Sequence, residues 1–337
     1  MSALAIESFA PDDPRRSAFD GVRGLPDAAP EPVAAGATCM LASRGGRPLA
    51  RCTLAVAHGL HGAPGASGLV GHYEALEREA GVALLEDARR SLAAQDVARV
   101  LAPMNGSTWA RYRLALPSQA GDAEFEPAHF LAEPRNPFEY PEHFESAGFS
   151  IAARYESRLD DRPGAEAPDV RAVAERVAAA GFTVRPLDPA RFDAELDALF
   201  DLSLETFADN LYYTPIGREA FRAMYEPFRG RLDPDFVLLA HDARGRLAAY
   251  QFAFPDPMSA RGGRPTRIVV KTVATAPAAR GQGLANHMLD RLRSLAHARG
   301  YAALIHALMH VSNFSMRMSG RHETRVFRRY ALYQWTP

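Results

Sequence analysis

A glycine-rich turn between two apolar segments limits what this chain can fold into more than any other feature. Residues 268–273 favour a strand, and residues 284–298 have apolar side chains at helical spacing. Between them lies Arg280-Gly281-Gln282-Gly283. Free backbone N–H groups and the helix dipole favour an anion at such a helix start, and glycine lets the anion approach closely. The turn therefore predicts a ligand that carries phosphate.

Three phosphate-binding patterns compete for this turn. A P-loop needs a lysine after its second glycine, but Lys271, the only lysine in the chain, comes before the glycines. A dinucleotide fingerprint needs a small residue at the position of Asn286. The third pattern, Arg/Gln-x-x-Gly-x-Gly/Ala, is matched by Arg280, Gly283 and Ala285. The third pattern is the one that fits.

The wider form of this pattern runs from Val273 through Pro277 to Gly283. It resembles the acyl-CoA pyrophosphate loop of the GCN5-related N-acetyltransferase (GNAT) superfamily. The resemblance implies acetyl-CoA or another acyl-CoA as co-substrate, without a metal. It also implies a pantetheine arm along the strand and a pyrophosphate on the loop. The implied contacts are Val273, Thr275, Arg280, Gly281, Gln282, Gly283, Leu284, Ala285, Asn313 and Ser315.

The order of expected elements shows how far this resemblance extends. Residues 182–337 give strand, helix, helix, three strands, loop, helix, strand, short helix and strand, which resembles the N-acetyltransferase fold. Residues 36–158 give an abbreviated version without the loop motif, and acidic residues follow the matching strand. The predicted fold is α/β (α+β), with two tandem acyl-CoA N-acyltransferase-like domains, each a mixed, mostly antiparallel sheet flanked by helices.

The expected domain boundaries follow from the composition and from the order of the expected elements. Residues 1–35 are rich in Pro, Ala and Asp without periodicity, which favours a disordered segment. We expect a degenerate GNAT-like domain over residues 36–158 and a linker with a short helix over residues 159–181. The GNAT domain with the acyl-CoA site is expected over residues 182–337.

Composition narrows the class of protein and its partners. An apolar content of 47% supports real hydrophobic cores, and a net charge of −1 gives no reason to expect binding to nucleic acid or to an anionic membrane. No apolar run approaches the ~18 residues that span a bilayer. Asp12, Asp13 and prolines stand where a signal peptide would be apolar. These features predict a cytoplasmic protein. The resemblance implies a small-molecule amine acceptor as its partner, and we expect a monomer or a homodimer.

The two cysteines, Cys39 and Cys52, flank Gly45-Gly46, which favours a hairpin turn. A two-residue turn there would pair residue 39 directly with residue 52 across the hairpin. In the cytoplasm, a pair of reduced, packed thiols is favoured over a disulfide.

The resemblance implies direct transfer of an acyl group from CoA to a neutral amine, which needs a base and a group that protonates the leaving thiolate. Many family members carry a tyrosine acid near the position of Ser319-Gly320, and none stands here. The catalytic candidates are therefore Lys271, His310 and Tyr330. Each also has a structural interpretation: a salt-bridged or solvated lysine, a histidine hydrogen-bonded near a strand end, and a tyrosine packed in a strand.

The residues after the first helix of the second domain are expected to line the acceptor pocket, as they do in the family. They are Glu205, Asn210, Tyr212 and Tyr213, and the two tyrosines could equally belong to the core. The predicted function is an N-acyltransferase that moves an acetyl or other acyl group from CoA to a primary amine of a small molecule. The alternatives are a catalytically silent acyl-CoA-binding or regulatory module, and a protein N-acetyltransferase.

Overall fold

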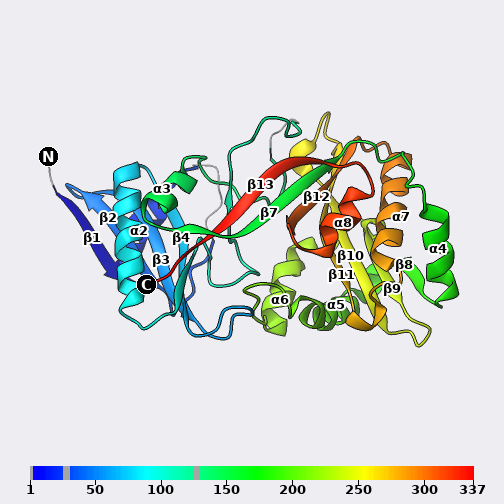
Figure 1. Cartoon of the computed structure of the whole chain (residues 1–337), viewed down its shortest axis with the longest axis horizontal. Coiled ribbons are helices and arrows are strands. Elements are labelled where there is room, and N and C mark those ends of the chain that lie inside the picture. The colour runs from blue at the N-terminus through cyan, green and yellow to red at the C-terminus, as the bar shows by residue number, and fades with distance from the viewer. Residues whose placement is uncertain (1–2, 26–30, 125–128) are drawn as a thin grey trace.

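The computed structural model describes residues 3–25, 31–124 and 129–337 and joins their strands into one sheet (Figure 1). This 13-stranded sheet has the order β1-β2-β3-β4-β5-β13-β7-β12-β11-β10-β9-β8, and β6 pairs with β13 beside this path. Most neighbours are antiparallel, and the parallel pairs are β4 with β5 and β11 with β12. The predicted fold class, two sheet regions flanked by helices in tandem, is confirmed.

The first half of the chain supplies one end of the sheet and its helices. Its strands are β1 (Leu4–Phe9), β2 (Thr38–Arg44), β3 (Arg47–Ala57), β4 (Ser67–Ala75), β5 (Arg99–Ala102), β6 (Leu114–Ala115) and β7 (Ser150–Asp160). Its helices are α1 (Arg16–Gly21), α2 (Arg78–Ala93) and α3 (Tyr140–Ser146).

The second half supplies the other end. Its strands are β8 (Thr183–Pro186), β9 (Val237–His241), β10 (Leu247–Pro255), β11 (Arg267–Thr275), β12 (Ala303–His310) and β13 (Arg325–Trp335). Its helices are α4 (Val170–Ala179), α5 (Phe192–Phe207), α6 (Arg218–Tyr225), α7 (Leu284–Ala298) and α8 (Phe314–Gly320).

Successive side chains of β11 point to opposite faces of the sheet, and this alternation gives the second half two cores. Val269 packs in the cluster that includes Phe200 and Leu196 of α5. Ile268 and Val270 pack in the cluster that includes Leu289 of α7. Helices α5 and α7 therefore cover opposite faces of the same strands.

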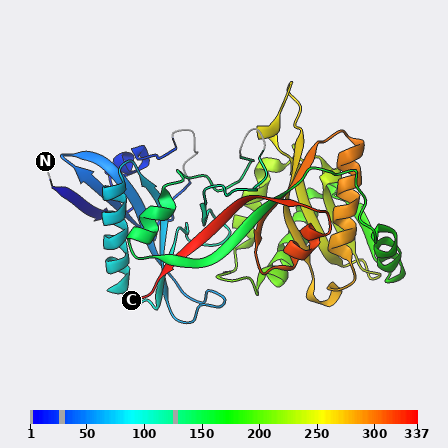
Figure 2. The ribbon, with the colours of Figure 1, turned by 45° about the horizontal axis from the view of Figure 1, so that its top comes forward.

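The two halves exchange their last strands. Strand β7, from the first half, pairs with β12, whereas the C-terminal strand β13 pairs with β5 of the first half. Strands β7 and β13 also pair with each other in antiparallel fashion. Figure 2 shows β13 reaching the first half. Each predicted half is thus completed in space by a strand of the other.

The N-terminal segment differs from its prediction. Strand β1 pairs with β2, and Phe19 of α1 is fully buried in a cluster with Phe9 and Cys39. The prediction of disorder over residues 1–35 is therefore wrong for residues 3–25, while residues 1–2 and 26–30 lie outside the described residues. A few apolar side chains without regular spacing anchor the segment, so periodicity gave no signal.

The register of the β2–β3 hairpin also differs from its prediction. Cys39 faces Thr53 and Met40 faces Cys52, because the pairing shifts between Ala42 and Ser43. A shift of one residue moves a side chain to the other face of a sheet. Cys39 accordingly packs beside α1 and Cys52 packs in the core that contains α2, so the predicted direct pair is wrong. Both thiols are buried and free.

Candidate functional site

A gap opens between the neighbouring strands β11 and β12. Their pairing runs from Arg267–Ala303 to Val270–His306 and continues no further in the described residues. On the other edge of β11, Phe252 faces Thr272 and Ala253 faces Val270, so Lys271 is an extra, bulged residue. Strand β12 has its own irregularity between His306 and Met309. Bulges bend strands, and the two bulges mark where the strands separate.

Two cavities meet at this gap. One, of about 560 Å³, extends toward the first half of the chain and is called the inner cavity below. The other, of about 680 Å³, extends to the turn before α7 and is called the loop cavity. Val273 and Asn313 are among the residues that line both. A long ligand can therefore pass from the glycine turn into the inner cavity.

The loop cavity brings together almost all residues that the resemblance assigned to acyl-CoA. Gly281 and Gly283 have φ values of 81° and 89°, in the left-handed region that favours glycine, and Gly283 precedes the first turn of α7. Among the residues that the resemblance assigned to acyl-CoA, Gln282 alone lines neither cavity. Those that line the loop cavity are Val273, Thr275, Arg280, Gly281, Gly283, Leu284, Ala285, Asn313 and Ser315.

Asn313 occupies the N-cap position of α8, where its side chain could have satisfied the helix end. The structure shows no capping hydrogen bond from that side chain. Its amide instead stands on the walls of both cavities, which favours a ligand contact over the capping interpretation.

Arg176 is a residue of the loop cavity that the sequence reasoning missed. It comes from α4, in the predicted linker, and its Nε donates to the carbonyl of Gln282 (3.3 Å). A Cβ added at Gly283 would lie 2.9 Å from Arg176 Nη2, so the guanidinium is packed against the turn. It lies about a hundred residues before the turn in a chain rich in arginine, and no local pattern could have singled it out.

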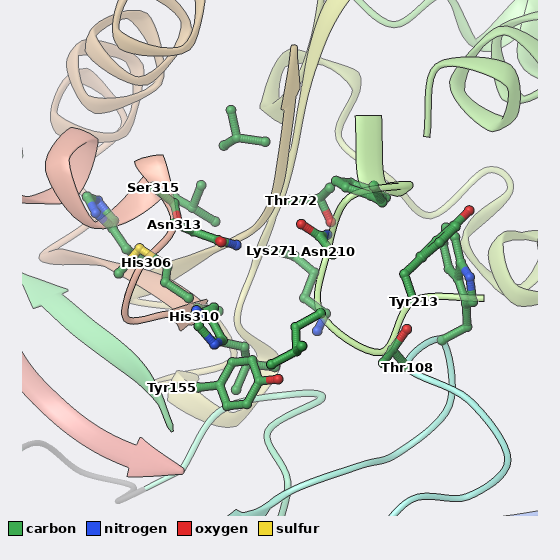
Figure 3. A pocket seen from close by; sticks show the side chains of 18 of the residues that line it. Thr108, Tyr155, Asn210, Tyr213, Lys271, Thr272, His306, His310, Asn313 and Ser315 are labelled. Atoms are coloured by element: carbon green, nitrogen blue, oxygen red, sulfur yellow. The ribbon is translucent and has the colours of Figure 1, made fainter. Parts of the chain in front are cut away.

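Lys271 lines the inner cavity as a half-buried side chain (Figure 3). No hydrogen bond or ion pair joins it to another residue in the described part of the chain. Burial and, to a smaller extent, the nearby Arg113 guanidinium together lower the pKa of its ammonium group to about 8. The salt-bridged interpretation is not supported, and near pH 8 an appreciable fraction of Lys271 is neutral.

His310 lines the same cavity and is held in one tautomer. Its Nδ1 accepts from the backbone N–H of Ser312 (3.2 Å), so in the neutral ring the proton is on Nε2. Its ring meets the ring of Tyr155 edge-on at 5.1 Å between centroids (Figure 3). Burial and, to a smaller extent, Arg113 lower the pKa of His310. His310 can therefore donate a hydrogen bond from Nε2 but is a poor base.

The first half of the chain forms part of the inner cavity wall. Trp109 donates through Nε1 to the carbonyl of Thr214 (2.9 Å), and its ring lies against Tyr213. This contact joins a loop of the first half to the segment after α5. Asn210 and Tyr213, both predicted for the acceptor pocket, line this cavity. The residues that the first half contributes are Thr108, Trp109, Tyr112, Arg113 and Tyr155.

Three predicted site residues lie elsewhere. Tyr330 is fully buried, its hydroxyl donating to Glu133 (2.7 Å) and lying 3.0 Å from Ser157 Oγ. Tyr212 and Tyr330 pack in one core cluster. Glu205 is exposed on α5 and lines neither cavity. Tyr330 is therefore a tyrosine packed in a strand, and Tyr212 belongs to the core. Glu205 lies on the solvent-exposed side of the helix.

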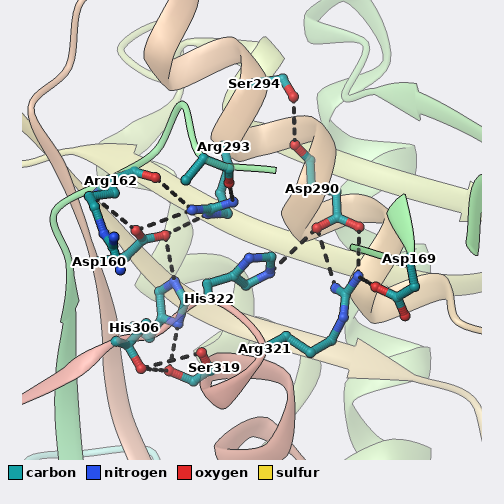
Figure 4. A network of polar contacts seen from close by, with 12 residues as sticks. Asp160, Arg162, Asp169, Asp290, Arg293, Ser294, His306, Ser319, Arg321 and His322 are labelled. Carbon is teal, nitrogen blue, oxygen red and sulfur yellow. Dashed lines mark hydrogen bonds and ion pairs between the residues drawn. The ribbon is translucent and has the colours of Figure 1, made fainter. Parts of the chain in front are cut away.

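Near the position where family members carry a tyrosine acid, this chain has Ser319, whose side chain is buried in the protein interior. Ser319 Oγ lies 2.8 Å from His306 Nδ1 and 3.0 Å from Thr324 Oγ1 in a buried network (Figure 4). In the same network Arg293 donates to Asp160 (2.6 Å), joining α7 to the end of β7. Burial lowers the pKa values of His306 and His322 to about 4. These imidazoles are neutral at pH 7 and serve the packing.

The corresponding gap in the first half is filled by the chain itself. Strands β4 and β5 pair only from Ser67–Arg99 to Leu69–Leu101. Beyond them the Asn105 side chain accepts from the backbone N–H of His72 (2.7 Å) and donates to Glu31 (2.6 Å). The cavity there has about 60 Å³. This gap therefore leaves little room for a ligand.

A family model described as an acetyltransferase (GNAT) domain matches residues 187–312. This match covers β11, the glycine turn, α7 and β12, which bound the two cavities. Residues 187–312 therefore form a GNAT acetyltransferase domain, a fold that supports acyl transfer from CoA. No match was found among curated proteins.

Solved structures show the same fold over both halves. A GCN5-related N-acetyltransferase from Sphaerobacter thermophilus aligns with a TM-score of 0.53 and 14% identity over 99% of this chain and 95% of that one. A tandem GNAT protein from the clavulanic acid biosynthesis pathway aligns with a TM-score of 0.53 and 14% identity over 99% and 98%. The glucosamine N-acetyltransferase region of a fungal multi-domain β-N-acetylglucosaminidase aligns at 0.57 and 13% over 99% of this chain, which spans 38% of that chain.

The described residues offer neither a candidate membrane-spanning helix nor a candidate metal site. None of their helices is long and apolar enough to cross a membrane. No group of three or more His, Cys, Asp or Glu side chains among them could hold a metal ion.

Proposed function

We propose that this protein is an N-acyltransferase that transfers an acetyl or other short acyl group from CoA to the primary amine of a small molecule. The observation that carries the proposal is the junction of the loop cavity and the inner cavity at the gap between β11 and β12. The pyrophosphate would bind the amides of residues 280–285, and the pantetheine arm would follow Val273 and Thr275. The thioester would then reach the wall that carries Lys271.

The proposed chemistry uses two groups of the inner cavity. Neutral Lys271 takes the proton as the amine nitrogen attacks the thioester carbonyl. The Nε2–H of His310 stabilises the negative charge that develops on the carbonyl oxygen. When the carbon–sulfur bond breaks, the proton on Lys271 passes to the CoA thiolate, so no tyrosine acid is required.

A small-molecule acceptor is favoured over a protein because the inner cavity is walled by both halves of the chain. A silent module would not need the unpaired Lys271 beside the gap. The location in the cytoplasm and the monomeric or dimeric state stay predictions.

The test is turnover of acetyl-CoA with a panel of amines, read as release of free thiol, together with calorimetric titration of acetyl-CoA. We expect both binding and amine-dependent thiol release. Binding without release from any amine would favour the silent module, and the absence of binding would overturn the site.

The part played by α4 gives a further prediction. Arg176→Ala should weaken acetyl-CoA binding about 10-fold, because the loop cavity loses a cation that can bond the phosphates directly. The matched control is Arg171→Ala, since Arg171 is exposed on the same helix and lines neither cavity. Equal affinities for the two variants by calorimetry would exclude α4 from the site.

A further inference from the structure

Arg113 belongs to the first half of the chain but lies on the wall of the inner cavity. Its φ of 75° is in the left-handed region, which is unfavourable for a residue with a Cβ. Its backbone N–H donates to the carbonyl of Pro103 (3.0 Å), which holds this conformation. Residues kept in such conformations occur often at functional sites.

The guanidinium of Arg113 lies in the corner between two aromatic rings, whose planes meet at 85°. Its Cζ lies 3.9 Å from the ring centroid of Tyr112 and 4.1 Å from that of Tyr155. Its Nη1 donates to the carbonyl of Leu308 (3.2 Å), while Nε has no partner and Nη2 bonds no described residue. Since Nη1 is already bonded, the Nε–Nη2 edge is the part of the guanidinium left for a ligand, and its parallel N–H groups match a carboxylate.

The charges on the inner cavity wall do not balance. No carboxylate of the described residues forms an ion pair with Arg113 or with Lys271. The one acidic side chain on this wall, Asp209, is exposed and also borders the loop cavity. Stacking on aromatic rings replaces only part of the hydration of a buried cation. An anionic occupant would complete the cavity.

CoA does not supply this anion in the proposed arrangement. Its phosphates belong in the loop cavity, which Arg113 does not line. Arg113 also borders the small cavity of about 60 Å³ in the first half, but Glu31 and Glu74 already stand on that wall. The unmatched positive charge therefore lies on the acceptor side of the gap.

We propose that the acceptor amine carries a carboxylate, as an amino acid does, and that the Nε–Nη2 edge of Arg113 binds it while the amine faces Lys271. This substrate class rests on the proposed acyltransferase function. Recognition of the carboxylate by a residue of the first half also gives the degenerate copy a role in substrate selection.

Pairs of amines that differ only in the carboxylate test the proposal. For the wild type, thiol release should show kcat/KM at least about 10-fold higher for amino acids than for the corresponding decarboxylated amines and carboxamides. Arg113→Gln should raise KM for amino acids by about 10- to 100-fold and change KM for the decarboxylated amines far less. Arg113→Lys keeps the charge but not the paired donors, so its KM for amino acids should lie between those of the wild type and Arg113→Gln.

The control is Arg111→Gln, because Arg111 is in the same loop, pairs with Glu31 (3.0 Å) and does not line the inner cavity. Thermal unfolding of each variant shows whether it is folded. A loss that is equal for both members of an amine pair would overturn the proposal, as would a preference for phosphorylated amines. If acetyl-CoA binds but no amine reacts, the proposed function fails by itself. The Arg113 site would still be supported if calorimetry showed that the wild type binds amino acids and that Arg113→Gln does not. If the wild type bound no amino acid either, the Arg113 site would be overturned.

Discussion

Lys271→Met is expected to lower kcat/KM by about 10²- to 10⁴-fold while leaving the affinity for acetyl-CoA unchanged. The side chain stands in the inner cavity without a partner in the described residues, and methionine fills a similar volume without a titratable nitrogen. Steady-state thiol release and calorimetric titration of acetyl-CoA measure the two effects. Lys271→Arg should be equally inactive, because a guanidinium keeps its proton at any pH of the assay. Activity in the arginine variant would show that only the charge matters.

The same lysine predicts a pH profile and a change in stability. Since neutral Lys271 is the base, kcat/KM for the wild type should rise with pH around an apparent pKa near 8, the value to which burial lowers it. The folded pKa lies below the unfolded value of 10.5, so the unfolded chain holds more protons between pH 8 and 10.5. Stability therefore rises with pH across that window, and the full cost of burying the charge is present below it.

Lys271→Met removes that cost. At pH 7 we expect its free energy of unfolding to exceed that of the wild type by on the order of 2 kcal/mol, with the difference vanishing toward pH 10.5. Denaturant unfolding at several pH values measures it. Tyr330→Phe is the contrasting control: it loses the hydrogen bond to Glu133 and should be less stable yet active, since Tyr330 lies outside both cavities. A lysine variant that is both less stable and active would indicate a structural lysine.

The composition supports this reading of Lys271. It is the only lysine among 39 basic residues, so arginine serves wherever a permanent cation is sufficient. Lysine is the basic side chain that can become neutral near physiological pH after burial. Its place on a bulge at the opening of the gap is where a base would be needed.

The strand, turn and helix around the glycines could be predicted because their information is local. The helix over residues 284–298 follows from apolar spacing, and α7 has those bounds. The cavity residues of the turn follow from a motif in which glycine conformation and helix start act together. A motif of this kind fixes the residues that a phosphate would contact, wherever the rest of the chain lies.

The acceptor side could not be predicted because it is assembled from distant segments. Arg113 and Tyr155 reach the cavity only through the exchange of β7 and β13 between the halves, which no periodicity reveals. Tyr330 was chosen for its chemistry, but strand register decided that it faces the core. The hairpin register failed for a related reason, since an irregularity between Ala42 and Ser43 leaves no composition signal.

Arg280→Glu is expected to weaken acetyl-CoA binding by about 100-fold or more. Arg280 is an exposed side chain at the mouth of the loop cavity, just before the glycines that turn the backbone N–H groups toward the ligand. The substitution replaces a cation that attracts the pyrophosphate with a carboxylate that repels it, and the helix dipole alone cannot offset this change. Calorimetric titration gives the dissociation constant directly.

Two comparisons show whether the loss is specific to the phosphates. Arg244→Glu makes the same change of charge in the exposed turn between β9 and β10 and should bind acetyl-CoA as the wild type does. A truncated donor, acetyl-pantetheine, has no pyrophosphate, so its slower turnover should be the same in the wild type and in Arg280→Glu. If Arg280→Glu retained wild-type affinity, the phosphates would lie away from the turn, and the path from the loop cavity to Lys271 would no longer define the donor site. Loss of acetyl-CoA affinity with unchanged use of the truncated donor would instead place the pyrophosphate at the turn and the reacting thioester beyond it.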